Sequence, residues 1–89
     1  MLAQRVEPLP IDRVIVERID QAQTGISGCV NYTITGRTAD EPSRHVQYQT
    51  LSDWRAALCE RAKTSGATVL IRWRQTAYAK DISRVEIAR

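Results

Sequence analysis

Three stretches in the first fifty residues alternate between apolar and polar positions, the period of a β-strand that buries one face. Residues 11–19 are rich in β-branched side chains but alternate imperfectly, which predicts a long first strand that bends or carries a bulge. Residues 29–35 alternate cleanly, and residues 45–49 do so again. Polar segments that contain glycine separate these stretches, at 21–28 and 36–43, and they predict turns.

At Thr50 the period lengthens to about 3.6 residues, which predicts a single helix. Residues 50–53 fit a capping box with the hydroxyl of Thr50 at the N-cap, and Ser52 is a competing N-cap candidate. Gly66 suits the residue just after the helix. The apolar residues of this segment fall on one helical face: Leu51, Trp54, Leu58 and Ala62. We therefore expect this face to pack into the body of the protein.

Two further stretches with strand character follow the helix, at residues 68–74 and 82–87. The segment between them interrupts the apolar pattern, so it predicts the connection of a hairpin. In the last stretch Val85 and Ile87 share a face that Ile82 does not. A bulge near Ser83 would bring all three to the same side.

Three strands, one helix and two more strands predict a mainly β domain. Five short strands avoid exposed edges by curling into a partly open antiparallel β-barrel, with the helix between the third and fourth strands plugging its open end. The order of elements over residues 11–88 resembles the OB-fold, and residues 68–87 (TVLIRWRQTAYAKDISRVEI) resemble the last hairpin of small OB modules. The chain departs from many OB domains in two ways: its first strand lacks a glycine, and its second and third strands lack outward aromatic residues. A different β-rich fold with the same order is the alternative.

Size and charge distribution narrow the class of protein. Eighty-nine residues, 43% of them apolar, suit one folded domain over residues 11–89, preceded by an extended lead-in over residues 1–10. Residues 1–53 hold five arginines and seven acids, a net charge of −2, whereas residues 54–89 hold eight basic residues and three acids, a net of +5. A basic C-terminal part favours an anionic partner.

Several function classes find no support in the sequence. No apolar run is long enough to cross a membrane, and no secretory signal is visible, which favours the cytoplasm. Cys29 and Cys59 are expected to be thiols packed as small apolar groups, and one histidine with two cysteines cannot complete a tetrahedral metal site. His45 lacks a marked nucleophile beside it. We therefore expect a protein that is not an enzyme and needs no cofactor.

One set of residues in the C-terminal hairpin has the chemistry of a binding site. Arg72 and Arg74 should leave the same face of a strand, and in a hairpin other basic and aromatic groups would gather around them. The residues predicted to bind are Arg72, Arg74, Tyr78, Lys80 and Arg84, with Arg37 and Arg44 extending the track if their loop folds toward the same side. Such a patch suits single-stranded DNA or RNA, whose phosphates bind arginine and whose bases stack on aromatic rings.

The same features allow a second interpretation. Arg72 and Arg74 can lie on the solvent-exposed face of an ordinary amphipathic strand and pair with Glu86. The chain would then be a protein-interaction module: a small subunit, an inhibitor that docks on an acidic protein surface, or a barrel that forms a homo-oligomer through its first or last strand.

Overall fold

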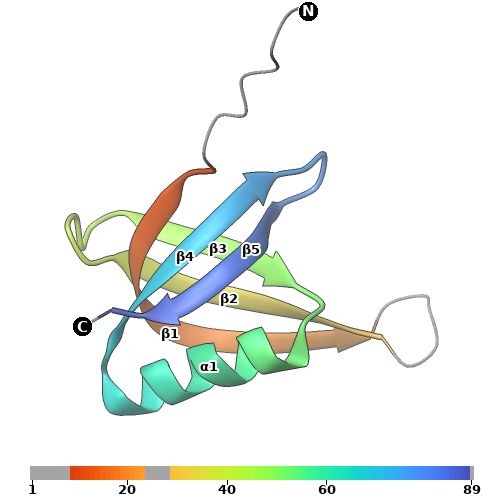
Figure 1. Cartoon of the computed structure of the whole chain (residues 1–89), viewed down its shortest axis with the longest axis horizontal. Coiled ribbons are helices and arrows are strands. Elements are labelled where there is room, and N and C mark those ends of the chain that lie inside the picture. The colour runs from red at the N-terminus through yellow and green to blue at the C-terminus, as the bar shows by residue number, and fades with distance from the viewer. Residues whose placement is uncertain (1–8, 24–28, 89) are drawn as a thin grey trace, which may run out of the picture.

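The computed structural model describes residues 9–23 and 29–88, which form a β-barrel with one helix beneath it (Figure 1). Its elements in chain order are β1 (Ile11–Gln23), β2 (Val30–Thr38), β3 (His45–Thr50), α1 (Asp53–Ser65), β4 (Thr68–Gln75) and β5 (Lys80–Ile87). Most of the lead-in predicted for residues 1–10, and most of the turn predicted after β1, lie outside the described residues.

The five strands close into a barrel in the order β1-β2-β3-β5-β4. All neighbouring strands are antiparallel except β3 and β5, which run parallel and meet at a single register pair, Gln49 and Asp81. The mainly β fold, the five-stranded barrel and the helix between the third and fourth strands are confirmed, and the architecture is compatible with an OB-like fold. β3 and β5 therefore share fewer register partners than any other pair of neighbouring strands in the barrel.

The bend predicted in the first strand is a β-bulge, which shifts the register between Val16 and Arg18. Val16 lies opposite Gly36 of β2, where an added Cβ would collide with the backbone oxygen of Ile15. Gly36 thus allows β1 and β2 to approach closely. This glycine lies on β2 and not on the first strand. The turn predicted for residues 36–43 begins later than expected, because β2 continues to Thr38.

The last hairpin contains the second predicted bulge. The β4–β5 register shifts after Arg72, so that Arg72 lies opposite Arg84 while Trp73 lies opposite Ile82. Ser83 is the extra residue, and Ile82 and Val85 are both buried in the barrel. The interior also holds Val14, Ile34, Tyr48, Val69 and Ile71, and none of these five side chains is exposed.

The helix ends at the predicted glycine, but it begins at the competing N-cap candidate and not at the predicted capping box. Ser52, not Thr50, is the N-cap, and its hydroxyl accepts a hydrogen bond from the backbone N–H of Arg55 at 3.4 Å. Gly66 ends the helix with φ 73°, the left-handed conformation that glycine adopts without strain.

The helix face that packs against the barrel differs from the prediction. Ala56, Cys59 and Ala62 are buried, whereas Leu51 and Trp54 are 62% and 61% exposed. The small side chains of the buried face allow the helix backbone to lie close to the strands, and this orientation turns Trp54 toward solvent. Leu51 precedes the first residue of α1 and so has no place on its buried face. The expectation that Leu51 and Trp54 plug the barrel is wrong.

Candidate functional site

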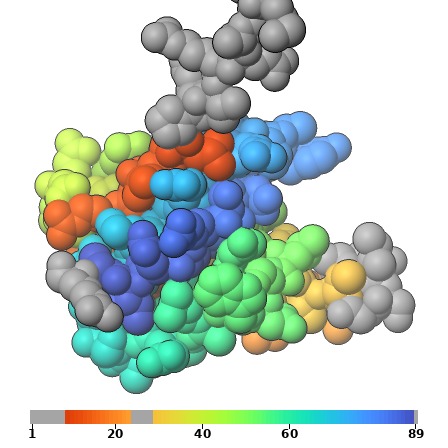
Figure 2. Space-filling model, viewed as in Figure 1, coloured from red at the N-terminus to blue at the C-terminus, as the bar shows by residue number. Residues whose placement is uncertain are grey.

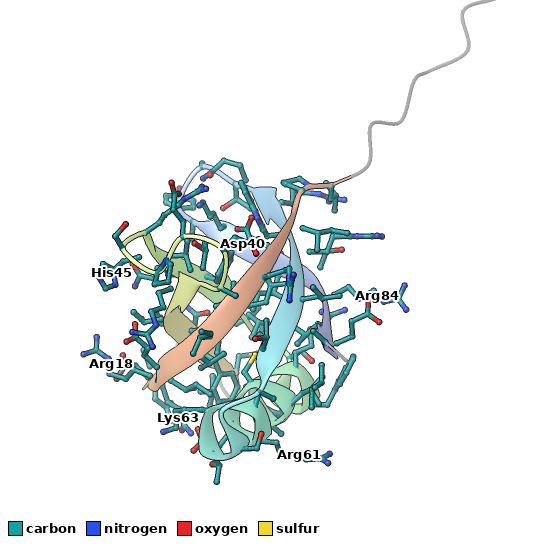
Figure 3. All side chains as sticks on the ribbon, turned by 90° about the vertical axis from the view of Figure 1, so that its left-hand side faces the viewer. Arg18, Asp40, His45, Arg61, Lys63 and Arg84 are labelled. Atoms are coloured by element: carbon teal, nitrogen blue, oxygen red, sulfur yellow. The ribbon has the colours of Figure 1, made fainter. Side chains whose placement is uncertain are left out.

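The outward face of the β4–β5 hairpin brings three of the predicted binding residues together. Arg72 and Arg74 are two residues apart on β4, so their side chains leave the same side of the strand. Arg84 of β5 is the direct register partner of Arg72, and Figure 3 shows Arg84 pointing away from the barrel. We call Arg72, Arg74 and Arg84 the arginine cluster. The cluster depends on the Ser83 bulge, because the bulge sets the register that places Arg84 opposite Arg72.

Like charges that face each other across a ladder repel unless something neutralises them. On β1, by contrast, the arginines have carboxylate partners: Arg18 pairs with Asp20 at 2.8 Å and Arg13 with Asp40 at 3.8 Å. Within residues 9–23 and 29–88, no arginine of the cluster makes such an ion pair. The buried Nε of Arg72 also has no hydrogen-bond partner in that part of the chain.

Two acids share this face of the hairpin. Asp81 lies opposite Arg74 in the register, and Glu86 follows Arg84 by two residues on the same strand. Both are exposed. The three arginines outnumber these two carboxylates, so this face keeps a net positive charge. Because both carboxylates are exposed, they stay hydrated and reduce that charge only in part.

Tyr78 lies at the tip of the hairpin and is 96% exposed. Thr76 organises the tip: its backbone N–H donates to the carbonyl oxygen of Ala79 at 2.8 Å, and its Oγ1 accepts from the N–H groups of Tyr78 and Ala79 at 3.3 and 3.1 Å. An ordered turn thus holds a fully accessible aromatic ring beyond the end of the barrel.

Lys80 lies on the inner face of the hairpin and is separated from the arginine cluster. Its Nζ is 4.5 Å from the ring centroid of Trp73 and 5.8 Å from that of Tyr48. Both aromatic side chains donate hydrogen bonds to Asp12 of β1, Trp73 through Nε1 at 2.9 Å and Tyr48 through its hydroxyl. Lys80, Trp73, Tyr48 and Asp12 form what we call the barrel-end network.

Arg37 lies on a different wall of the barrel. In the register it faces Ile15 of β1 and His45 of β3, and His45 and Arg84 point to opposite sides of the molecule (Figure 3). The loop before β3 folds onto β1, where the N–H of Ala39 donates to the carbonyl oxygen of Arg13 at 2.8 Å. The structure does not bring Arg37 to the arginine cluster.

Arg44 lies beside an open hollow of about 440 Å³ next to β1. The hollow is lined by Ile11, Asp12, Arg13, Thr38, Asp40, Glu41 and Arg44. Because Ile11 is the register partner of Arg72, the hollow adjoins β4, the strand that carries Arg72 and Arg74. Its lining holds three acids and two arginines, so Arg44 adds little positive potential to the hairpin.

Two titratable side chains in the interior have raised pKa values. Burial, followed by the hydrogen bond to Asp12, raises the pKa of Tyr48 far above its usual range. Burial raises the pKa of the Cys59 thiol to about 11, which keeps it protonated and unreactive. His45 is exposed, with Nδ1 3.9 Å from Oε1 of Glu17. The described part of the chain contains no group of three side chains that could hold a metal ion.

Fold and site together define a small β-barrel with a cationic outer hairpin and an exposed tyrosine at its tip. No known protein family, curated protein or solved structure shows a significant similarity to this chain. Among the residues that the structure describes, no helix is long and apolar enough to span a membrane.

Proposed function

We propose that this protein binds single-stranded nucleic acid through the outer face of the β4–β5 hairpin. The observation that carries the proposal is the juxtaposition of Arg72 and Arg84, which are register partners across the β4–β5 ladder and form no ion pair among the described residues. A phosphate between them would neutralise both, and Arg74 continues the same row.

Tyr78 favours an unpaired strand over a duplex. An aromatic ring that is almost fully exposed at a loop tip can stack on a base only where the base is free of its complementary strand. Bases of any type offer a face for stacking, so this arrangement predicts little sequence preference. Lys80 contributes less in this proposal, because its ammonium group lies over Trp73 on the other side of the hairpin.

The proposal is tested by fluorescence anisotropy with a short labelled oligothymidylate at several salt concentrations. Three phosphate contacts predict that log K falls against log salt with a slope of about −2. Arg72→Ala with Arg84→Ala should weaken binding about tenfold and flatten that slope. Tyr78→Ala should weaken binding about fivefold or more with the slope unchanged.

The matched control removes two positive charges elsewhere. Arg18 and Arg61 lie outside the hairpin, on β1 and α1, and the double variant Arg18→Ala, Arg61→Ala has the same net charge as the hairpin variant (Figure 3). It should bind like the wild type. An equal loss in both variants, or no binding at low salt, would overturn the proposal. Stronger binding to poly-L-glutamate than to the oligonucleotide would favour an acidic protein surface as the partner.

A further inference from the structure

The hollow beside β1 holds a carboxylate and a guanidinium group that do not neutralise each other. Glu41 and Arg44 both line it, three residues apart in the loop between β2 and β3. The backbone N–H of Arg44 donates to the carbonyl oxygen of Glu41 at 2.8 Å, and the hydroxyl of Thr38 donates to the same oxygen at 2.7 Å. Neither charged side chain forms an ion pair within residues 9–23 and 29–88. An ordered turn thus presents both groups to a ligand of the hollow.

The other two acids of the hollow already have partners. Asp12 accepts hydrogen bonds from Tyr48 and Trp73, and Asp40 lies 3.8 Å from Arg13. The lining as a whole holds three carboxylates and two guanidinium groups, a net charge of −1. Such a surface repels a phosphate, but it can bind an uncharged group that has polar edges.

Ile11 connects the hollow to the arginine cluster. It lines the hollow, is 51% exposed and is the register partner of Arg72, which in turn faces Arg84. Because neighbouring strands lie about 4.8 Å apart, these three residues form a short line across β5, β4 and β1. Figure 3 shows Arg84 and Asp40 on either side of β1. A single strand whose phosphates lie on the arginines therefore reaches the hollow over an apolar side chain, and the uncharged group it can place there is a base.

Guanine is the base whose polar edges match Glu41 and Arg44. Its N1–H and its N2 amino group are neighbouring donors, and its O6 and N7 are neighbouring acceptors. A carboxylate accepts from the first pair, and a guanidinium group donates to the second. Adenine, cytosine and thymine each lack a pair of neighbouring donors. The hollow, at about 440 Å³, has the size of a small-molecule site and is large enough for a purine.

We infer that the hollow binds a guanine base of the same single strand whose phosphates lie on the arginine cluster. The carboxylate of Glu41 accepts from N1–H and the N2 amino group, and the guanidinium group of Arg44 donates to O6 and N7. The inference rests on the proposed function and adds selectivity to it. Tyr78 stacks on a base of any type, whereas the hollow distinguishes one base from the other three.

Two oligonucleotides of equal length test the selectivity: oligothymidylate, and a strand of alternating thymine and guanine. Both carry the same number of phosphates, so the arginine cluster contributes equally to the binding of each. In fluorescence anisotropy the guanine-containing strand should bind about tenfold more tightly. Hypoxanthine lacks the N2 amino group of guanine, and 7-deazaguanine lacks its N7. Replacing the guanines by either base should remove most of the difference.

Variants of the hollow assign the two contacts. Glu41→Gln should bind the guanine and hypoxanthine strands equally, and Arg44→Gln should bind the guanine and 7-deazaguanine strands equally. Each should also reduce the tenfold preference over oligothymidylate to about twofold or less. The matched control Glu60→Gln removes an exposed carboxylate from α1 and should keep the full preference. Circular dichroism verifies that each variant is folded.

The inference and the proposed function fail separately. If neither strand binds at low salt, the proposed function is wrong and the inference is wrong with it. If the wild type binds both strands equally, or if the preference for guanine survives Glu41→Gln, only the inference is wrong. Nuclear magnetic resonance supplies a second readout: the amide signals of Ile11, Glu41 and Arg44 should shift with the guanine-containing strand and stay in place with oligothymidylate. Identical shifts with both strands would contradict a guanine site in the hollow.

Discussion

Trp73 of β4 donates its indole N–H to Oδ2 of Asp12 on β1, at 2.9 Å. The hydroxyl of Tyr48, on β3, donates to the same oxygen. One carboxylate thus joins three strands that lie far apart in the chain, and Lys80 of β5 covers the two rings. The barrel-end network fixes the relative positions of the strands at the end of the barrel opposite α1 (Figure 1).

Removing the Asp12 carboxylate should be costly. In Asp12→Ala the hydroxyl of Tyr48 and the indole N–H of Trp73 both lose their acceptor in a partly buried setting, which should lower the free energy of unfolding by about 2–4 kcal/mol. Urea unfolding followed by tryptophan fluorescence measures the loss. Asp81→Ala removes an exposed carboxylate from the same end of the barrel and should change stability by less than about 0.5 kcal/mol. Equal effects of the two substitutions would contradict the role of Asp12.

The sequence predicted the strands and helix because their signals are local. Alternation reveals which residues of a strand share a face, and it placed Arg72 and Arg74 together correctly. It also indicated the Ser83 bulge, which sets Arg84 opposite Arg72. Alternation does not reveal which wall of a barrel a strand occupies, so it could not separate Arg37 from the hairpin.

Other parts of the site depend on contacts that no local pattern encodes. Asp12 binds Trp73 across 61 positions of sequence, and a polar residue near the start of a strand gives no sign of such a partner. Lys80 stands at the end of a connection predicted as a loop, whereas it is the first residue of β5 and its side chain turns to the inner face. Trp54 is exposed because the small residues on the other face of the helix pack closely against the strands. Apolar periodicity did not predict this face, because it gives small side chains little weight.

Tyr48 should make stability depend on pH in the alkaline range. Its pKa in the folded protein is raised well above the ordinary value of 10.0. Below pH 10 the folded and unfolded forms both keep the proton, so this group causes no change. Above it, the unfolded tyrosine ionises first, and the free energy of unfolding should fall by about 1.4 kcal/mol per pH unit. Urea unfolding at several alkaline pH values measures this slope, and Tyr48→Phe should lack that part of it. An unchanged slope in Tyr48→Phe would assign the dependence to other groups.

Two glycines should differ in their tolerance of alanine. Gly36→Ala drives a Cβ into the backbone oxygen of Ile15, so it should destabilise the barrel by about 2–4 kcal/mol. Gly66 has a positive φ but no atom near its missing Cβ, so Gly66→Ala should cost only about 1 kcal/mol. Thermal unfolding of the two variants gives the order directly. A larger loss at Gly66 would show that the close approach of β1 and β2 relaxes easily.

The buried thiol of Cys59 should resist modification. Its pKa of about 11 leaves almost no thiolate at neutral pH, and its side chain is inaccessible. Alkylation by iodoacetamide, followed by peptide mass spectrometry, should modify Cys59 only slowly in the folded protein and rapidly in urea. Rapid modification without denaturant would mean that α1 separates readily from the barrel.

A change of side-chain size should affect the free energy of unfolding on one face of α1 but hardly on the other. Trp54 is 61% exposed, so Trp54→Ala should change the free energy of unfolding by less than about 0.5 kcal/mol. Ala62 is completely buried against the strands, and Ala62→Leu should destabilise the protein by about 1–3 kcal/mol because the helix has no room for the added atoms. Both variants are compared by urea unfolding at low protein concentration, so that self-association does not contribute. If Trp54→Ala proved the more damaging change, the helix would pack through its bulky residues, as the apolar periodicity of the sequence first indicated.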